Sequence, residues 1–324
     1  MTVMCASLFQ MGNATSDDSD SLAVRARQNV VLCILGLLFN STLLSVVCVS
    51  VRLRRSAKYQ LIASLSLADL LLSVVYLPLD TSMAFQGGVW EYGCSLMFFT
   101  YGLQEFVMPT IACLTLSALC IEYAVTMFYN VTPLIKRRVV RLGVALPWVI
   151  GFLALLPVFL KRIVTSSGSF SSPCTSRQWD AATLVLLMGI FGFLPVTFLL
   201  GTLVLMLVSH CCRPTNERIA VRTIISRSEG VYLTHEFSDT LVACLIFIAF
   251  NAPFLVEFTM HVQCEANMTC HSPTRVQHVL EVLRTAESVF FPAVWMVGME
   301  FRQGLFTSCK CCYKYCDMEV EIPV

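Results

Sequence analysis

Acidic residues stand inside runs that are otherwise apolar, and they are the residues whose chemistry narrows the function first. Asp69 lies in one such run, where a carboxylate at the centre of a membrane helix costs about 2.5–3.5 kcal/mol on insertion scales. Glu105, Glu257 and Glu281 fall in the outer halves of three further runs. Three acids gathered at one end of a membrane domain could receive a cationic amine or a basic peptide.

Arg284 offers a second interpretation of these acids. It lies one helical turn from both Glu281 and Glu287, so on a helix it could neutralise either of them. Structural pairing is therefore the favoured interpretation of Glu281. For Glu105, with Gln104 beside it, contact with a ligand is favoured.

Seven long apolar runs must position these side chains. About twenty apolar residues cross a bilayer as a helix, and a helix satisfies its own backbone hydrogen bonds in lipid. Only 13% of the residues are charged, against about 25% in soluble domains. The sequence predicts an all-α membrane protein, a seven-transmembrane helix bundle with spans at 28–51, 59–80, 95–127, 139–160, 180–209, 239–262 and 276–299.

Basic residues near the ends of the spans predict the orientation, because the cytoplasmic side carries more of them. One side holds most of the 22 lysines and arginines, including the groups at 52–58, 136–141, 213–227 and 302–314. The other side holds Arg25, Arg27, Lys161, Arg162, Arg177, Arg275 and Arg284. We therefore expect an extracellular N-terminus and a cytoplasmic C-terminus.

This orientation divides the chain into three parts. Residues 1–27 are predicted to be an extracellular tail that is disordered and glycosylated at Asn13, and 28–299 the membrane domain. Asn267 lies in an outer loop and is a second glycosylation site. Residues 300–324 are predicted to form a cytoplasmic amphipathic helix and a cysteine-rich tail. Palmitoylation is expected there at Cys309, Cys311 and Cys312.

Several classes of function are disfavoured. A net charge of +1 argues against nucleic-acid binding. The five histidines lie at or beyond span ends without the spacing of paired metal ligands, so we predict no enzyme and no zinc site. The absence of an internal repeat makes a small transporter the less favoured alternative.

Motifs occur one per span, in a fixed order. They are Gly36 with Asn40, Ser66-Leu-Ala-Asp69-Leu70, Trp148 with Pro157, Pro195, Phe247 with Pro253, and Pro292. By these motifs the chain resembles a rhodopsin-like G-protein-coupled receptor from about residue 28 to residue 312. The resemblance implies an orphan-type receptor of the plasma membrane that binds an extracellular ligand and signals to a heterotrimeric G protein or arrestin.

The resemblance also implies particular sites. Cys94 and Cys174 match the family's extracellular disulfide, and Cys264 with Cys270 is a plausible second bond. Pro253 and Pro292 are expected to be mobile hinges. Asp69 resembles the family's sodium-site aspartate, with Asn40, Glu287 and Ser288 as its polar neighbours. The alternative is a protonated or water-bridged Asp69 that only ties helices together.

The departures from the family concern its switch residues. The family's Asp-Arg-Tyr stands here as Ile121-Glu122-Tyr123, so the arginine that locks the inactive state has no counterpart. Asn251 occupies the sixth-span tryptophan position, and Trp295 replaces the seventh-span tyrosine. A weakly coupling, constitutively biased or arrestin-type receptor is therefore a serious variant. A scavenger or accessory seven-helix protein that acts without a G protein is the alternative.

Overall fold

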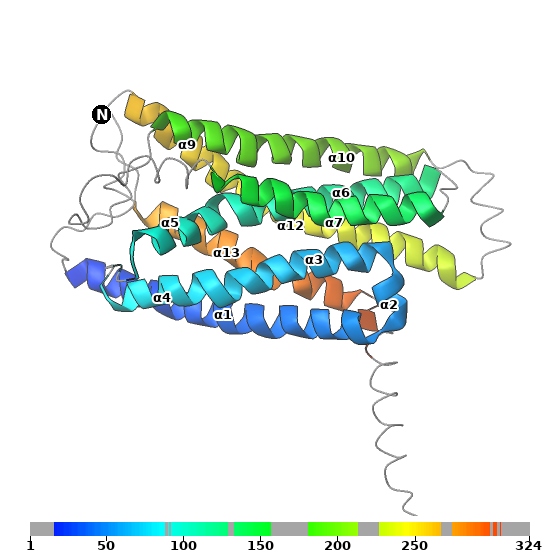
Figure 1. Cartoon of the computed structure of the whole chain (residues 1–324), viewed down its shortest axis with the longest axis horizontal. Coiled ribbons are helices and arrows are strands. Elements are labelled where there is room, and N and C mark those ends of the chain that lie inside the picture. The colour runs from blue at the N-terminus through cyan, green and yellow to red at the C-terminus, as the bar shows by residue number, and fades with distance from the viewer. Residues whose placement is uncertain are drawn as a thin grey trace, which may run out of the picture.

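The fold is a bundle of long helices lying side by side (Figure 1). The computed structural model describes residues 16–87, 90, 92–128, 133–156, 181–212, 227–266, 274–298, 301–302 and 305, and contains no strand among them. The helices are α1 (Ser16–Val49), α2 (Val51–Arg55), α3 (Ala57–Leu71), α4 (Leu77–Phe85), α5 (Cys94–Gly102), α6 (Met108–Phe128), α7 (Pro133–Leu153), α9 (Ala181–Met188), α10 (Leu194–Cys211), α12 (Arg227–Ala266) and α13 (Thr274–Val297).

Three π-helical turns join some of these helices into longer rods. The turns make α3 continuous with α4, α5 with α6, and α9 with α10, and they lie at Leu72–Tyr76, Leu103–Val107 and Gly189–Phe193. With α1, α7, α12 and α13, the described part of the chain forms seven rods, as the sequence predicts. We call the two ends of the bundle the α5 end and the α2 end, after the short helices that lie there (Figure 1).

Five of these rods are long and apolar enough to cross a membrane by composition alone, with spans at Leu22–Val49, Ala57–Phe85, Phe99–Met127, Val185–Cys211 and Phe237–Glu257. The other two carry more charge. α7 begins with four basic residues between 136 and 141, and α13 contains Arg275, Glu281, Arg284 and Glu287. Both still pack inside the bundle, since α7 contacts α6 and α13 contacts α1 and α12.

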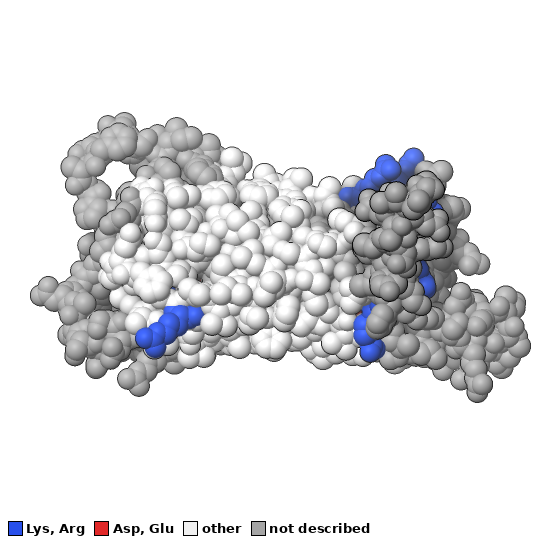
Figure 2. All heavy atoms as spheres, turned by 90° about the horizontal axis from the view of Figure 1, so that it is seen from below, with Lys and Arg blue, Asp and Glu red and all other residues white. Residues whose placement is uncertain are grey.

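The surface is the inverse of that of a soluble protein. Large apolar side chains such as Leu38, Leu146 and Leu245 are each exposed over at least half of their surface. In a membrane these side chains would contact the lipid chains. Figure 2 shows a broad band without charge and lysine and arginine gathered mainly toward one end. The buried core lies between the rods, where Leu65 and Phe247 are almost fully covered.

Two helices begin well before the spans predicted for them. α1 begins at Ser16, so the boundary predicted at residue 28 falls inside a continuous helix. Likewise α12 begins at Arg227, twelve residues before the predicted start of the sixth span. Residues 1–15 lie outside the described residues.

Prolines explain the positions of the π-helical turns. Each turn ends two residues before a proline, namely Pro78, Pro109 or Pro195. Proline has no N–H, so the carbonyl four residues before it loses its helical partner, and a widened turn relieves the clash with the ring. By contrast, α12 and α13 continue as α-helix through Pro253 and Pro292.

Donors from neighbouring helices reach the carbonyls that the prolines leave free. Thr110 Oγ1 donates to the carbonyl of Phe191, four residues before Pro195, at 2.9 Å. Asn40 Nδ2 donates to the carbonyl of Ser288, four residues before Pro292, also at 2.9 Å. In lipid these carbonyls have no water to bond, so the contacts hold helices together while satisfying the backbone.

Replacing Thr110 with valine keeps the side-chain shape but leaves the Phe191 carbonyl unsatisfied. We expect Thr110→Val to lower the free energy of unfolding by about 1 kcal/mol, in the range found for interhelical hydrogen bonds in membranes. Thermal unfolding of the purified protein in detergent measures this. Thr197→Val is the matched control, because exposed Thr197 donates to the Leu194 carbonyl within its own helix and, among the described residues, to no other helix. Equal losses in the two variants would contradict the role given to Thr110.

Candidate functional site

An ionic network joins three helices at the α5 end. Arg25 of α1 binds Asp80 of α4 through two hydrogen bonds, Nε to Oδ2 at 3.1 Å and Nη2 to Oδ1 at 3.0 Å. The same Nη2 lies 3.2 Å from Oε2 of Glu281 on α13. Asn29 Nδ2 also donates to Asp80 Oδ2, at 2.6 Å. Two carboxylates around one guanidinium leave a formal charge of −1.

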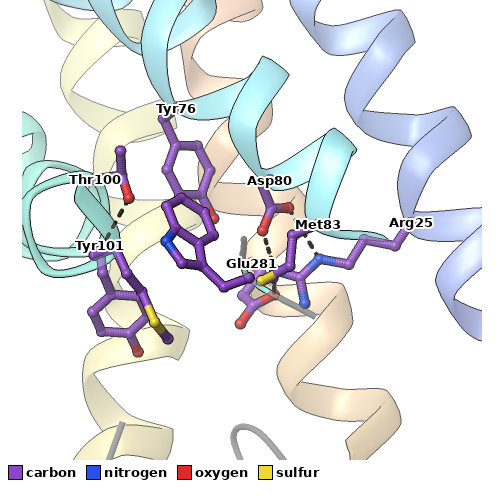
Figure 3. A pocket seen from close by; sticks show the side chains of 9 residues that line it. Arg25, Tyr76, Asp80, Met83, Thr100, Tyr101 and Glu281 are labelled. Carbon is purple, nitrogen blue, oxygen red and sulfur yellow. Dashed lines mark hydrogen bonds and ion pairs between the residues drawn. The ribbon is translucent and has the colours of Figure 1, made fainter. Parts of the chain in front are cut away.

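A small cavity opens beside this network (Figure 3). Its volume is about 30 Å³, which is room for a water molecule or two. The three charged residues share its lining with aromatic side chains that include Tyr76, Trp90 and Tyr101. Aromatic faces and a net negative charge together favour a cationic group. A larger ligand would have to widen this cavity.

A second ion pair lies deeper in the bundle. Arg284 Nη1 of α13 bonds Oε2 of Glu105 at 2.6 Å, and both side chains are at most 7% exposed. Arg284 Nη2 donates to the carbonyls of Glu105, at 2.7 Å, and of Gln104, at 2.9 Å. The Glu105 carbonyl is the one that Pro109 leaves free, four residues later. The guanidinium carbon also lies 4.3 Å from the ring centroid of Phe254.

The sequence leaves open which acid Arg284 meets, and Glu281 or Glu287 on its own helix could be that partner. In the structure Arg284 pairs with Glu105 on another helix. Glu281 has a structural partner, as favoured, and that partner is Arg25. The reason is geometric: the Arg284 side chain crosses to the π-helical turn Leu103–Val107, where carbonyls and a carboxylate converge.

The four residues proposed for ligand contact therefore lie at different depths. Glu281 lines the α5-end cavity, whereas Glu105 faces a cavity beside Phe254 and Asn251. Gln104 is buried, with Nε2 3.4 Å from Oγ1 of Thr285. Glu257 is half-buried on α12 and does not line these two cavities. The structure brings Gln104 and Glu105 together and leaves Glu257 apart.

The polar centre contains Asn40, Asp69, Glu287 and Ser288. Asn40 bridges α1 to the Ser288 carbonyl on α13, and Asn251 Nδ2 of α12 donates to Oε2 of Glu287 at 2.5 Å. Asn251, which stands at the family's tryptophan position, thus has a polar partner. Oδ2 of Asp69 and Oδ1 of Asn40 are buried and have no hydrogen-bond partner in the part of the chain that the structure describes. Asp69, Glu287 and Ser288 line a cavity of about 20 Å³, enough for one water or one small ion.

The predicted switch residues Glu122 and Tyr123 lie toward the α2 end. Tyr123 OH lies 2.8 Å from Nδ1 of His210 on α10, and the His210 ring stacks on Phe237 of α12 with centroids 4.0 Å apart. Glu122 accepts a hydrogen bond from Thr126 at 3.3 Å on its own helix. Phe247 and Trp295 are both buried in the core. The altered Tyr123 motif therefore joins α6, α10 and α12.

One contact at the α2 end was missed by the sequence analysis. Lys58 Nζ of α3 lies 3.7 Å from Oδ2 of Asp239 on α12 and 5.9 Å from the ring centroid of Trp295 on α13. Only 7% of the Lys58 side chain is exposed. Gly298 makes room for this pair, since a Cβ there would lie 3.1 Å from the Asp239 carboxylate. From the sequence, Lys58 is only one of the basic residues that predict the orientation in the membrane. Hydropathy does not indicate that Lys58 pairs with Asp239.

Part of the sequence prediction falls outside the described residues. Phe301 is 2% exposed and Arg302 is exposed, both in helical conformation, which agrees with an amphipathic helix after the last span. The side chains of Cys94 and Cys264 are not described, and several whole residues are not: Asn13, Cys174, Asn267, Cys270, Cys309, Cys311 and Cys312. The two disulfides, the glycosylation sites and the palmitoylation sites therefore stay predictions.

Removing Arg284 alone should destabilise the protein strongly, because it leaves the Glu105 carboxylate buried and unpaired. We expect Arg284→Gln to cost on the order of 3–5 kcal/mol, and the double variant with Glu105→Gln to recover much of this. Thermal unfolding in detergent is the measurement, with Arg27→Gln as the control because Arg27 is exposed. A double variant as unstable as Arg284→Gln would show that the pair itself is not the cause.

Comparison with models of known protein families assigns the chain to a family. The model of the family described as 7 transmembrane receptor (rhodopsin family) matches residues 39–295, more than three quarters of the chain. No curated protein matches it. The matched region begins inside α1 and ends inside α13, so it covers the five rods between them, the proline positions and the polar centre described above. The chain therefore belongs to the rhodopsin family of seven-transmembrane receptors.

Proposed function

We propose that this receptor lies in the plasma membrane with its α5 end outside and its α2 end in the cytosol. The exposed arginines at the α2 end support this orientation, because positive charge is retained on the cytoplasmic side. They are Arg52, Arg54, Arg55, Arg138 and Arg141. Figure 2 shows this gathering of basic residues at one border of the uncharged band.

The observation that carries the proposal is the Arg25 network at the α5 end. A ligand with a cationic group can compete with Arg25 for the carboxylates of Asp80 and Glu281, which now share one guanidinium. The aromatic lining of the cavity adds to the attraction of such a group. A cationic amine or a basic peptide is the class of extracellular ligand that fits this chemistry.

A single helix offers the route from this cavity to the other end. α13 carries Glu281 in the cavity, Arg284 in the buried ion pair, Glu287 in the polar centre and Trp295 beside Lys58. A ligand that releases Glu281 from Arg25 therefore changes the position of α13 relative to α1. Signalling is then a shift between two packings of the bundle, driven by the ligand's higher affinity for one of them.

At the α2 end, we propose that the Lys58–Asp239 ion pair stabilises the inactive packing of the helices. In the family this role belongs to the third-span arginine. The pair holds α12 against α3 and α13, and the Tyr123–His210–Phe237 contacts hold it against α6 and α10. When α12 separates, the inner face becomes open to a G protein or arrestin. Because Glu122 replaces the arginine, contact with that partner falls to other side chains.

Breaking the lock should raise signalling without any ligand. Lys58→Gln and Asp239→Asn are each expected to increase basal activity about fivefold or more, as a coupling free energy of 1–3 kcal/mol allows. A cell assay of all G-protein families and arrestin, normalised to surface expression, measures this. Arg52→Gln is the control, since Arg52 is exposed at the same end. If none of the variants signals through any G-protein family or through arrestin, a scavenger or accessory protein is favoured instead.

We also propose that the polar centre holds a sodium ion near Asp69. Asp69 Oδ2 and Asn40 Oδ1 have no hydrogen-bond partner among the described residues, and Asp69 lines a cavity together with Glu287 and Ser288. These features fit a small cation that takes oxygen ligands. Bound there, the ion would supply the positive charge that offsets two neighbouring carboxylates. The competing arrangement is a protonated or water-bridged acid.

Sodium should then raise the melting temperature of the purified protein, and Asp69→Asn should abolish the response. Asp80→Asn is the matched control, because Asp80 lies in the Arg25 network and not in the polar centre. Choline chloride at equal concentration controls for ionic strength. If choline stabilises the protein as well as sodium does, the competing arrangement is correct.

A further inference from the structure

Two cysteine thiols from different helices touch in the core of the bundle. Sγ of Cys120 on α6 lies 3.7 Å from Sγ of Cys244 on α12, although the two residues stand 124 positions apart in the sequence. Both residues are 0% exposed, and both are free thiols. The structure thus places two nucleophilic groups side by side that have no part in the function proposed above.

The thiol pair lies close to the contacts that hold α12 at the α2 end. Cys120 stands three residues before Tyr123 on α6, and Cys244 stands five residues after Asp239 on α12. Each distance is about one turn of a helix. Because α6 and α12 already pack together here, a covalent bond between the two sulfurs would hold α12 in place independently of the Lys58–Asp239 ion pair.

The geometry is within reach of a disulfide. Two thiols at 3.7 Å are in van der Waals contact, and a disulfide brings the sulfurs to about 2.05 Å. Each sulfur is one rotatable bond from its backbone, so small rotations about χ1 on both residues shorten the distance between them. The helices themselves do not have to move far. In the reducing cytosol such thiols stay unbonded until an oxidant arrives.

Another cysteine of α6 provides a comparison. Cys113 is 1% exposed and stands seven residues before Cys120, which is two helical turns along the same side of α6. A buried cysteine commonly acts as a small apolar residue, and this role accounts for Cys113. It does not require two thiols from different helices to face each other, as Cys120 and Cys244 do.

We propose that Cys120 and Cys244 are a site of oxidative modification, where hydrogen peroxide joins the two sulfurs in a disulfide that fastens α12 to α6. One sulfur attacks a peroxide oxygen, the O–O bond breaks, and a sulfenic acid and one water form. The second sulfur then attacks the sulfenic sulfur, the S–O bond breaks, and a second water leaves with the remaining thiol proton. The two sulfurs together lose two electrons, and the peroxide is reduced to water.

The access of peroxide to this site rests on the proposed function. A cysteine buried among apolar side chains is inert, so the closed packing protects both thiols. When α12 separates from the bundle at the α2 end, water and peroxide reach them. A sulfenic acid formed in the open packing is captured by the second thiol when the helices close again. The modification therefore falls on receptors that are opening, and it holds them in the closed packing.

Peptide mass spectrometry without reduction tests the bond on the purified full-length protein after treatment with hydrogen peroxide. The wild-type protein should yield a peptide in which Cys120 and Cys244 are joined, and Cys244→Ala should not. Cys113→Ala is the matched control, because it removes an equally buried thiol of α6 that lies outside the contact. Cys120→Ala repeats the test from the other helix. Absence of the joined peptide from the wild-type protein would overturn the site.

Thermal unfolding in detergent tests whether the bond fastens the helices. Peroxide should raise the melting temperature of the wild-type protein and of Cys113→Ala by roughly 5–10 °C, because the bond closes a long loop of the chain. Dithiothreitol should reverse the rise. An equal rise in Cys244→Ala, or a joined peptide without any rise, would overturn the fastening of α12.

The rate of bond formation separates this site from the proposed function. Lys58→Gln should form the joined peptide about fivefold faster than the wild-type protein, since its open packing is more populated. Arg52→Gln, at an exposed position of the same end, should form it at the wild-type rate. Equal rates in all three proteins would overturn the opening of α12 as the route for peroxide, while the joined peptide itself would still establish the site.

Discussion

The bundle depends on one constraint: a backbone carbonyl freed by proline inside a membrane must still find a donor. Three prolines leave carbonyls that other helices satisfy, through Thr110 to Phe191, Asn40 to Ser288 and Arg284 to Glu105. Each of these bonds joins two different rods. The prolines that weaken individual helices are thus the points where the helices are fastened to one another.

Arg284 shows how this constraint and the charge balance are met together. Its guanidinium satisfies two backbone carbonyls and one carboxylate in a single buried position. That position lies between the α5-end network and the polar centre, and α13 contributes to all three. Any movement of α13 therefore changes backbone bonding as well as ionic contacts, which favours two discrete packings over a continuous deformation.

Hydropathy and motif order were sufficient to predict the seven rods and the family. They were insufficient to predict which charged side chains pair with one another. Which acid Arg284 meets depends on how α13 and the Leu103–Val107 turn are rotated, and one sequence leaves that rotation open. Lys58 lies at the start of α3 and Asp239 at the predicted start of the sixth span, and a charged residue at the end of a span is ordinarily expected to be solvated. Arg25 was placed in a tail because its acidic partner is 55 residues away.

The charges of α13 also bear on how the chain is assembled during synthesis. Four ionisable residues make this helix a poor substrate for insertion by itself, because each charged residue near the middle opposes partition from the translocon into lipid. Arg25 and Glu105 neutralise two of those groups, and both belong to segments made much earlier. Insertion of the last helix is therefore assisted by the first and third rods, which are already in the bilayer. Membrane insertion of the chain thus depends on the same ion pairs that stabilise the mature protein.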